Sequence, residues 1–212
     1  MPLRLVFDQL ADPNPRKIEQ AVEIMHKGGV AAYPTDSIYA LGCAIESRDG
    51  IERIYKAKNM NRKQKLALIC PDLSTASRFG QFSQAAYALA KKIFPGPYTL
   101  VVPATHEVPR MLTHDKRRTV GIRITTHPIA QALVTALGRP LLTSSAVYAN
   151  PEDEDEMLTC RDAEEVLEAF ARHLDVVIDA PQTQAAPSTV IEVEGDEITL
   201  IREGQGSLDV LE

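Results

Sequence analysis

Apolar residues recur along the chain at two spacings, one typical of helices and the other of buried strands. Helical spacing predicts helices over 14–27, from a cap at Asp49, from a cap at Ser83, over 128–138 and over 162–173. Short apolar runs predict strands over 30–33, 66–70, 98–102, 119–124, 141–146, 175–179, 188–193 and 198–202. The first helix is the clearest of these elements, because Asn14 can cap it, Pro15 suits its first position and Gly28 can end it.

The order of these elements predicts the fold class. Strands alternate with helices in the first part of the chain, whereas the last two strands form a hairpin around residues 194–196. We therefore expect an α/β fold in which a twisted sheet of mixed parallel and antiparallel strands has flanking helices. The sequence shows neither an internal repeat nor a linker, so we expect residues 1–212 to form a single domain.

Polar side chains follow directly after the strand over 30–33. Pro34 breaks that strand, and Thr35, Asp36 and Ser37 come next. A buried strand that ends in polar groups on a stiff turn can hold a ligand in an α/β protein. The same pattern is also compatible with an ordinary junction between a strand and a loop.

Hydroxyl groups and cations recur at the ends of other predicted strands. Arg123 lies among Val and Ile residues, where its charge needs either an internal carboxylate or a bound anion. The full set is Thr35, Ser37, Lys56, Lys58, Thr119, Arg123, Ser144, Ser145, Ser188 and Arg202. If these side chains converge, they suit a nucleoside triphosphate and a small carboxylate, with catalysis by positioning and charge neutralisation.

Charge is unevenly distributed along the 212 residues, whose net charge is −6. Residues 1–125 carry 19 Lys or Arg and 11 Asp or Glu, whereas residues 126–212 carry 4 and 18. Five of the cations fall in the segment 56–65: Lys56, Lys58, Arg62, Lys63 and Lys65. This asymmetry indicates either that the first part meets an anion or that both parts are simply solvated surfaces.

Several classes of protein are excluded by the motifs that the sequence lacks. It contains no phosphate-binding loop, dinucleotide fingerprint, nucleophile elbow or His-Glu-x-x-His helix. Cys43, Cys70 and Cys160 form no Cys-x-x-Cys pair, which indicates reduced thiols and a cytoplasmic protein without a structural metal. The acidic run 152–156 is interpreted as a mobile loop. No apolar run is long enough for a membrane span, and the first residues do not resemble a secretory signal.

Five segments, in order along nearly the whole chain, resemble the YrdC-like family. They are Tyr-Pro-Thr-Asp-Ser-x-Tyr-x-Leu-Gly (33–42), Pro-Gly-Pro-Tyr-Thr-Leu (95–100), Thr-Val-Gly-Ile-Arg (119–123), Pro-Ser-Thr-Val-Ile (187–191) and Ile-Arg-Glu-Gly (201–204). Further segments, such as Pro-Ile-Ala-Gln-Ala-Leu (128–133), resemble the YciO branch of that family.

The resemblance implies a fold similar to that of dihydroxybutanone phosphate synthase, built around a basic concave cavity. It also implies an activity. Family members that are L-threonylcarbamoyladenylate synthases join threonine, bicarbonate and ATP with Mg²⁺ and release pyrophosphate, for threonylcarbamoyladenosine formation in tRNA. Other relatives are described as binding double-stranded RNA or tRNA in the same cavity.

The resemblance also suggests roles for individual residues. By position, Thr35, Arg123, Ser145 and Ser188 match the threonine site. The residues expected to contact nucleotide or RNA are Lys56, Lys58, Arg62, Lys63, Lys65, Thr119 and Arg202.

Two departures from the synthase pattern leave two functions open. The Lys-x-Arg-Pro of synthases is Lys56-Ala57-Lys58-Asn59 in this chain, and their Ser-x-Asn is Ser145-Ala146-Val147. A lysine lacks the bidentate fork of an arginine, and a lost polar contact typically costs about 1 to 3 kcal/mol. The chain is therefore either a slow or altered synthase, or a non-catalytic protein that binds double-stranded RNA or tRNA.

Overall fold

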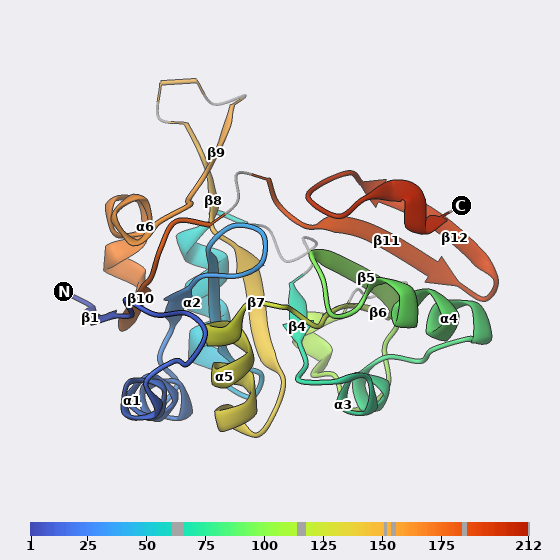
Figure 1. The fold of residues 1–212 in the computed structure, drawn as a ribbon, viewed down its shortest axis with the longest axis horizontal. Helices are drawn as coiled ribbons and strands as arrows, with labels where there is room; N and C mark the ends of the chain where they lie inside the picture. Colours follow the sequence, from blue (N-terminus) through green and yellow to red (C-terminus); the bar gives the residue numbers. More distant parts are fainter. Residues whose placement is uncertain (61–65, 114–117, 151, 154–155, 184–185, 212) are drawn as a thin grey trace.

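A single mixed sheet runs through the whole molecule (Figure 1). The computed structural model describes the chain except for residues 61–65, 114–117, 151, 154–155, 184–185 and 212. Within the described residues the sheet has ten strands. In sheet order they are β1 (Leu3–Val6), β10 (Val176–Asp179), β2 (Ala31–Tyr33), β3 (Ala40–Ala44), β7 (Leu141–Ser145), β4 (Ala67–Ile69), β6 (Thr119–Arg123), β5 (Tyr98–Pro103), β11 (Thr189–Glu194) and β12 (Glu197–Arg202).

The directions of the strands confirm the predicted mixed sheet. The parallel pairs are β1–β10, β10–β2, β4–β6 and β5–β11. The antiparallel pairs are β2–β3, β3–β7, β7–β4, β6–β5 and the β11–β12 hairpin. Gly195, with φ +64°, lies in the turn of that hairpin, as the sequence predicts.

Helices cover the two faces of the sheet unequally. On one face, α1 (Pro15–His26) and α5 (Pro128–Leu137) pack over the part of the sheet that contains β10, β2, β3 and β7. On the other face lie α2 (Arg48–Ala57), α3 (Leu73–Phe79), α4 (Gln84–Ile93) and α6 (Ala163–Phe170), which share a second apolar cluster with the sheet. The chain termini lie at opposite ends of the molecule, next to the edge strands β1 and β12 (Figure 1).

Helix ends follow the sequence signals closely, with one correction. The Asn14 side chain accepts a hydrogen bond from the Arg16 amide at 3.0 Å, and Gly28 follows the helix at φ +89°. The prediction that Asp49 caps α2 is wrong, because the Ser47 hydroxyl accepts from the Gly50 amide at 3.0 Å. Asp49 lies in the first turn instead, where a carboxylate still favours the positive end of the helix dipole.

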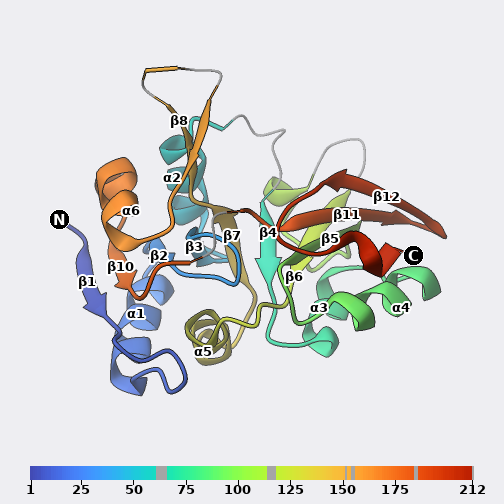
Figure 2. The same cartoon turned by 45° about the horizontal axis from the view of Figure 1, so that its top comes forward.

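Four strands were not predicted. β1 is short, and its partner β10 lies at the other end of the chain. β3 consists largely of small residues, which are weak strand formers, and it forms by pairing with β2 and β7 under helices on both faces. The strands β8 (Val147–Ala149) and β9 (Met157–Thr159) pair with each other in a separate hairpin that projects from the domain (Figure 2). The acidic run lies between them, partly outside the described residues.

One face of β6, β5 and β11 carries polar side chains instead of a helix. Val120 and Ile122 of β6 belong to the cluster under α2, α3, α4 and α6, so Gly121 and Arg123 face the other way. Among the described residues, the cluster built on α1 and α5 includes none from β6, β5, β11 or β12. No helix of the described residues packs over this face in the cluster of α1 and α5, so a site can form there.

The helices that the structure describes are all too short or too polar to cross a membrane.

Candidate functional site

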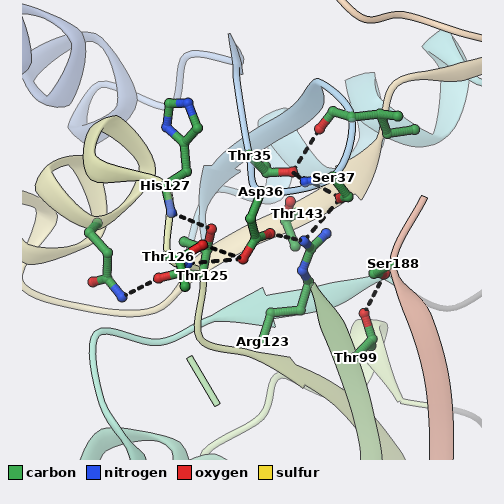
Figure 3. A network of polar contacts seen from close by, with 12 residues as sticks. Thr35, Asp36, Ser37, Thr99, Arg123, Thr125, Thr126, His127, Thr143 and Ser188 are labelled. Carbon is green, nitrogen blue, oxygen red and sulfur yellow. Dashed lines mark hydrogen bonds and ion pairs between the residues drawn. The ribbon is translucent and has the colours of Figure 1, made fainter. Parts of the chain in front are cut away.

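The buried polar side chains of the described residues are almost all hydroxyls, and most of them are drawn together in Figure 3. They are Thr35, Ser37, Thr99, Arg123, Thr125, Thr143, Ser144, Ser188 and Thr189. Arg123 is the one charged residue of this set. Buried hydroxyls and a buried guanidinium need partners, so their hydrogen bonds define the site.

The loop after β2 is held in shape by its own side chains. The Thr35 hydroxyl donates to the Ile38 carbonyl at 2.7 Å and accepts from the Ser37 amide at 3.1 Å. The Thr35 and Ser37 hydroxyl oxygens are 3.0 Å apart. This compact turn fixes the direction of the Asp36 and Ser37 side chains toward β6 (Figure 3).

Arg123 at the end of β6 forms an internal ion pair with Asp36. Its Nη2 lies 2.8 Å from Asp36 Oδ1 and 3.2 Å from Ser37 Oγ, and the two charged side chains are only 3% and 6% exposed. Of the two roles open for Arg123, the salt bridge is thus shown. Arg123 Nε is buried without a hydrogen-bond partner among the described residues.

The second carboxylate oxygen of Asp36 binds the segment that leads into α5. Asp36 Oδ2 accepts from the Thr126 amide at 2.9 Å, and the Thr126 hydroxyl is 3.4 Å away. The neighbouring His127 is half-buried, and burial lowers its pKa to about 4. Asp36 therefore ties the loop after β2 to the segment between β6 and α5, which lies almost 90 residues later.

A second group of polar contacts lies on the same face of the sheet. The Thr99 and Ser188 hydroxyl oxygens are 2.9 Å apart, and Arg202 Nη2 donates to the Ser188 carbonyl at 2.8 Å. In the register of β5 and β6, Leu100 is opposite Ile122, so the next pair brings Thr99 beside Arg123. Arg202 lies on the exposed edge strand β12, and partial desolvation together with the charge of Arg123 lowers its pKa.

Lys58, just beyond α2, reaches the end of β7. Its Nζ donates to Ser144 Oγ at 2.8 Å and to the Ser145 carbonyl at 2.6 Å. Burial lowers the pKa of Lys58 to about 8, and the positive charge of Arg202 acts in the same direction. Arg123 thus lowers the pKa of Arg202, and Arg202 lowers the pKa of Lys58.

The structure does not gather all the residues that the sequence singles out. Thr35, Lys58, Arg123, Ser145, Ser188 and Arg202 lie in or beside the two groups of contacts. Thr119 is on the same face as Arg123 but at the opposite end of β6. Lys56 is exposed on α2, and its charge acts on His173. Arg62, Lys63 and Lys65 lie outside the described residues.

Sequence reasoning missed several members of the site. Asp36 was noted in the loop but was not assigned as the partner of Arg123, and neither Thr99 nor Thr126 was singled out. The one available signal was the requirement that a buried arginine have a carboxylate partner. A single sequence cannot say which of many carboxylates supplies it.

A cavity of about 670 Å³ lies elsewhere, between the end of α1 and the start of α2. It contains none of the predicted site residues. Arg53 and Asp175 in its wall are paired with each other at 2.7 Å, and Asp175 also accepts from the Val30 amide. Both charges are thus already engaged with each other and with backbone groups, so the polar groups on β6, β5 and β11 remain the candidate site.

The described side chains favour the binding of anions. Three cations surround hydroxyl groups at the site, whereas Asp36 is already held by Arg123 and Thr126. In the part of the chain that the structure covers, no group of three or more His, Cys, Asp or Glu residues could hold a metal ion. Guanidinium and ammonium groups are the usual protein partners of carboxylates and phosphates.

Fold and site together define an α/β protein with a central, cation-rich polar cluster. The chain belongs to the Sua5/YciO/YrdC family, described as "telomere recombination", which it matches over residues 23–204. The recognition of the YrdC-like family from the sequence is therefore confirmed.

Three relatives illustrate the range of the family. The chain is 40% identical to "uncharacterized protein YciO" of Escherichia coli K12, over 93% of both chains. The crystal structure of E. coli YciO superposes with a TM-score of 0.88, over 99% of this chain and 98% of YciO. It is 30% identical to threonylcarbamoyl-AMP synthase of Coxiella burnetii, over 80% of this chain and 88% of the relative. The structure of P. abyssi Sua5 complexed with L-threonine has a TM-score of 0.84 at 27% identity, over 96% of this chain and 57% of Sua5.

Proposed function

We propose that the protein joins threonine, bicarbonate and ATP, with Mg²⁺, into threonylcarbamoyl-AMP and releases pyrophosphate. The observation that carries this proposal is the polar cluster of Arg123, Ser188, Arg202 and Lys58, in a chain whose relatives include threonylcarbamoyl-AMP synthases. The product would serve threonylcarbamoyladenosine formation in tRNA.

The ion pair at the centre of the cluster suits a free amino acid. Threonine carries a carboxylate and an ammonium group, and Arg123 and Asp36 present the two opposite charges side by side. In this proposal the threonine carboxylate lies near Arg123, with Thr35, Ser145 and Ser188 supplying hydroxyls nearby. Exchange of an internal carboxylate for a substrate carboxylate at one guanidinium keeps that charge paired throughout.

The remaining cations suit the phosphates of ATP. Lys58 and Arg202 come from opposite sides of the cluster, and their mutual repulsion is relieved by an anion between them. We also propose that Thr119 and Lys56 contact the nucleotide. Mg²⁺ enters with ATP, because the one carboxylate of the described cluster, Asp36, is already engaged by Arg123 and Thr126. The metal would therefore be held mainly by phosphate oxygens and water.

Pyrophosphate release from ATP, measured with and without threonine and with and without bicarbonate, tests this function. We expect release to require both substrates and to fall at least about tenfold in Arg202→Gln, because a charge-assisted contact contributes about 1.5 to 3 kcal/mol. Arg139→Gln is the matched control, since Arg139 is an exposed arginine paired with Glu46 on the surface. Release that is independent of threonine would overturn the proposal.

Restoration of the synthase pattern gives a second test of the same function. The double variant Lys58→Arg with Val147→Asn restores the arginine and the asparagine that synthases have at these two positions. We expect pyrophosphate release to rise roughly 10- to 100-fold, the equivalent of one to two recovered polar contacts.

A second candidate function, binding of double-stranded RNA or tRNA, is favoured by the excess of cations in residues 1–125. Binding that depends on phosphate contacts weakens steeply as salt rises, because counterions are released. Titration of labelled tRNA at two salt concentrations tests this candidate. Affinity that does not change with salt would exclude phosphate-dominated binding.

A further inference from the structure

Lys58 Nζ lies beside two uncharged hydrogen-bond acceptors, and its side chain is partly buried. Its Nζ donates to Ser144 Oγ and to the Ser145 carbonyl, and no third partner is found among the described residues. A protonated lysine has three N–H groups, whereas a neutral amine has two N–H groups and a lone pair. The neutral amine can make both of these hydrogen bonds with its two N–H groups, and its lone pair then remains unused.

The charges that face Lys58 favour the same form. Arg202 of β12 repels the ammonium form, and Arg123 of β6 acts on Arg202 in turn. Cys160, after β9, acts in the opposite direction, and no carboxylate is among the groups that shift the pKa of Lys58. With a pKa of about 8, about half of Lys58 is neutral at pH 8, whereas an ordinary lysine is neutral in only about one molecule in 300.

We propose that Lys58 Nζ is a carbamylation site, at which carbon dioxide adds reversibly to form a lysine carbamate. The nitrogen lone pair forms a bond to the carbon of CO₂, one carbon–oxygen π bond breaks to give a carboxylate oxygen, and one N–H proton leaves to solvent. The reaction consumes one amine and one CO₂ and yields one carbamate and one proton, without any oxidant or reductant.

The surroundings of Lys58 suit the product as well as the amine. A carbamate is an anion, and it would lie near the guanidinium of Arg202, whose positive charge has no described carboxylate against it. The Ser144 hydroxyl accepts a hydrogen bond from the amine, and rotation of that hydroxyl lets it donate to a carbamate oxygen instead. Carbamylation thus replaces the amine of Lys58 by an anion within the cluster.

This inference goes beyond the proposed function and does not depend on it, because it needs neither ATP nor threonine. The neighbouring lysine on the same helix provides the control. Lys56 is exposed and lies two residues earlier, and it meets water instead of the end of β7. Lys56 lacks the burial and the two acceptors that hold Lys58, so it should react much less with CO₂.

The experiment measures carbamate carbon by ¹³C NMR on the full chain in ¹³C-bicarbonate at pH 8, without ATP or threonine. We expect the parent chain to give two carbamate signals, one from the terminal amine of Met1 and one from Lys58. Lys58→Arg should lose the second signal, because a guanidinium does not form a carbamate under these conditions, whereas Lys56→Arg should keep both. Alkylation of the carbamate, followed by peptide mapping, assigns the modified residue.

Each outcome decides the inference. A second signal that survives in Lys58→Arg, or that is lost equally in Lys56→Arg, would overturn it, as would the Met1 signal alone in the parent chain. Circular dichroism establishes that each variant is folded. Arg202→Gln is a further variant, in which the Lys58 signal should weaken several-fold because the cation near the carbamate is gone. Absence of pyrophosphate release, by contrast, would count against the synthase proposal alone.

Discussion

Replacement of Asp36 by asparagine tests the central ion pair most directly. The asparagine side chain would have nearly the same shape but no charge, so the Arg123 guanidinium would remain buried without a counterion. The two side chains of the parent pair are 6% and 3% exposed and only 2.8 Å apart, so water can replace the lost carboxylate only poorly. The removal of one partner from a buried pair costs about 3 to 5 kcal/mol.

Asparagine retains one oxygen that can accept from Arg123 or from the Thr126 amide, so we expect the lower end of that range. For a chain of this size, each kcal/mol lowers the melting temperature by about 2 to 4 °C. Asp36→Asn should therefore destabilise the protein by about 3 kcal/mol and lower its melting temperature by roughly 6 to 12 °C. Urea and thermal unfolding followed by circular dichroism measure both quantities.

The surface pair of Glu46 and Arg139 is the matched control. Its atoms are 2.6 Å apart, but the side chains are about half exposed. Glu46→Gln should therefore cost at most about 1 kcal/mol. The double variant Asp36→Asn with Arg123→Met should recover part of the stability lost in Asp36→Asn, because no buried charge remains unpaired. A loss in Asp36→Asn no larger than in Glu46→Gln would refute this reasoning.

Three further changes test other parts of the structure. Burial lowers the pKa of His127 to about 4, so His127 takes up a proton on unfolding when the pH is below about 6.5. The free energy of unfolding should therefore fall by roughly 1 to 3 kcal/mol between pH 6.5 and pH 4. In urea unfolding, His127→Gln should make this dependence on pH weaker. Gly42→Ala would place a Cβ 2.4 Å from a carbonyl oxygen of β7, so its melting temperature should fall further than that of Gly138→Ala, which meets no atom within 4 Å and is strained only by its φ of +70°. Ser83→Ala removes the hydroxyl that caps α4 through the Ala86 amide and should cost about 1 kcal/mol in denaturant unfolding.

The sequence was sufficient to predict the helices and strands that are specified by residues close together in the chain. The helix from Pro15 to His26 is specified by its own cap, its proline and its apolar face, and its end by Gly28. The strands that the sequence failed to indicate depend on distant partners. β3 contains Gly42 and several small residues, and it pairs with β7 about 100 residues later. Neither spacing nor propensity contains that information.

The candidate site likewise has a part that could be predicted from the sequence and a part that could not. The individual groups Thr35, Arg123, Ser188 and Arg202 could be identified, since hydroxyls and cations at strand ends are unusual in a buried segment. Their pairing could not be identified, because Asp36 and Arg123 are 87 residues apart and meet only through the order of the strands. The low pKa of Lys58 likewise results from burial by segments that are remote in sequence.

The order of strands in the sheet has a consequence for synthesis on the ribosome. The described partner of β1 is β10, which is made roughly 170 residues later. At about 5 to 20 residues per second, the first strand waits on the order of 10 to 30 s for its partner. Asp36 likewise emerges before Arg123, and Ser188 and Arg202 follow last. A nascent chain therefore exposes an unpaired edge strand and an incomplete polar cluster until β10, Ser188 and Arg202 have been made, so ligand binding would report that these late segments are in place.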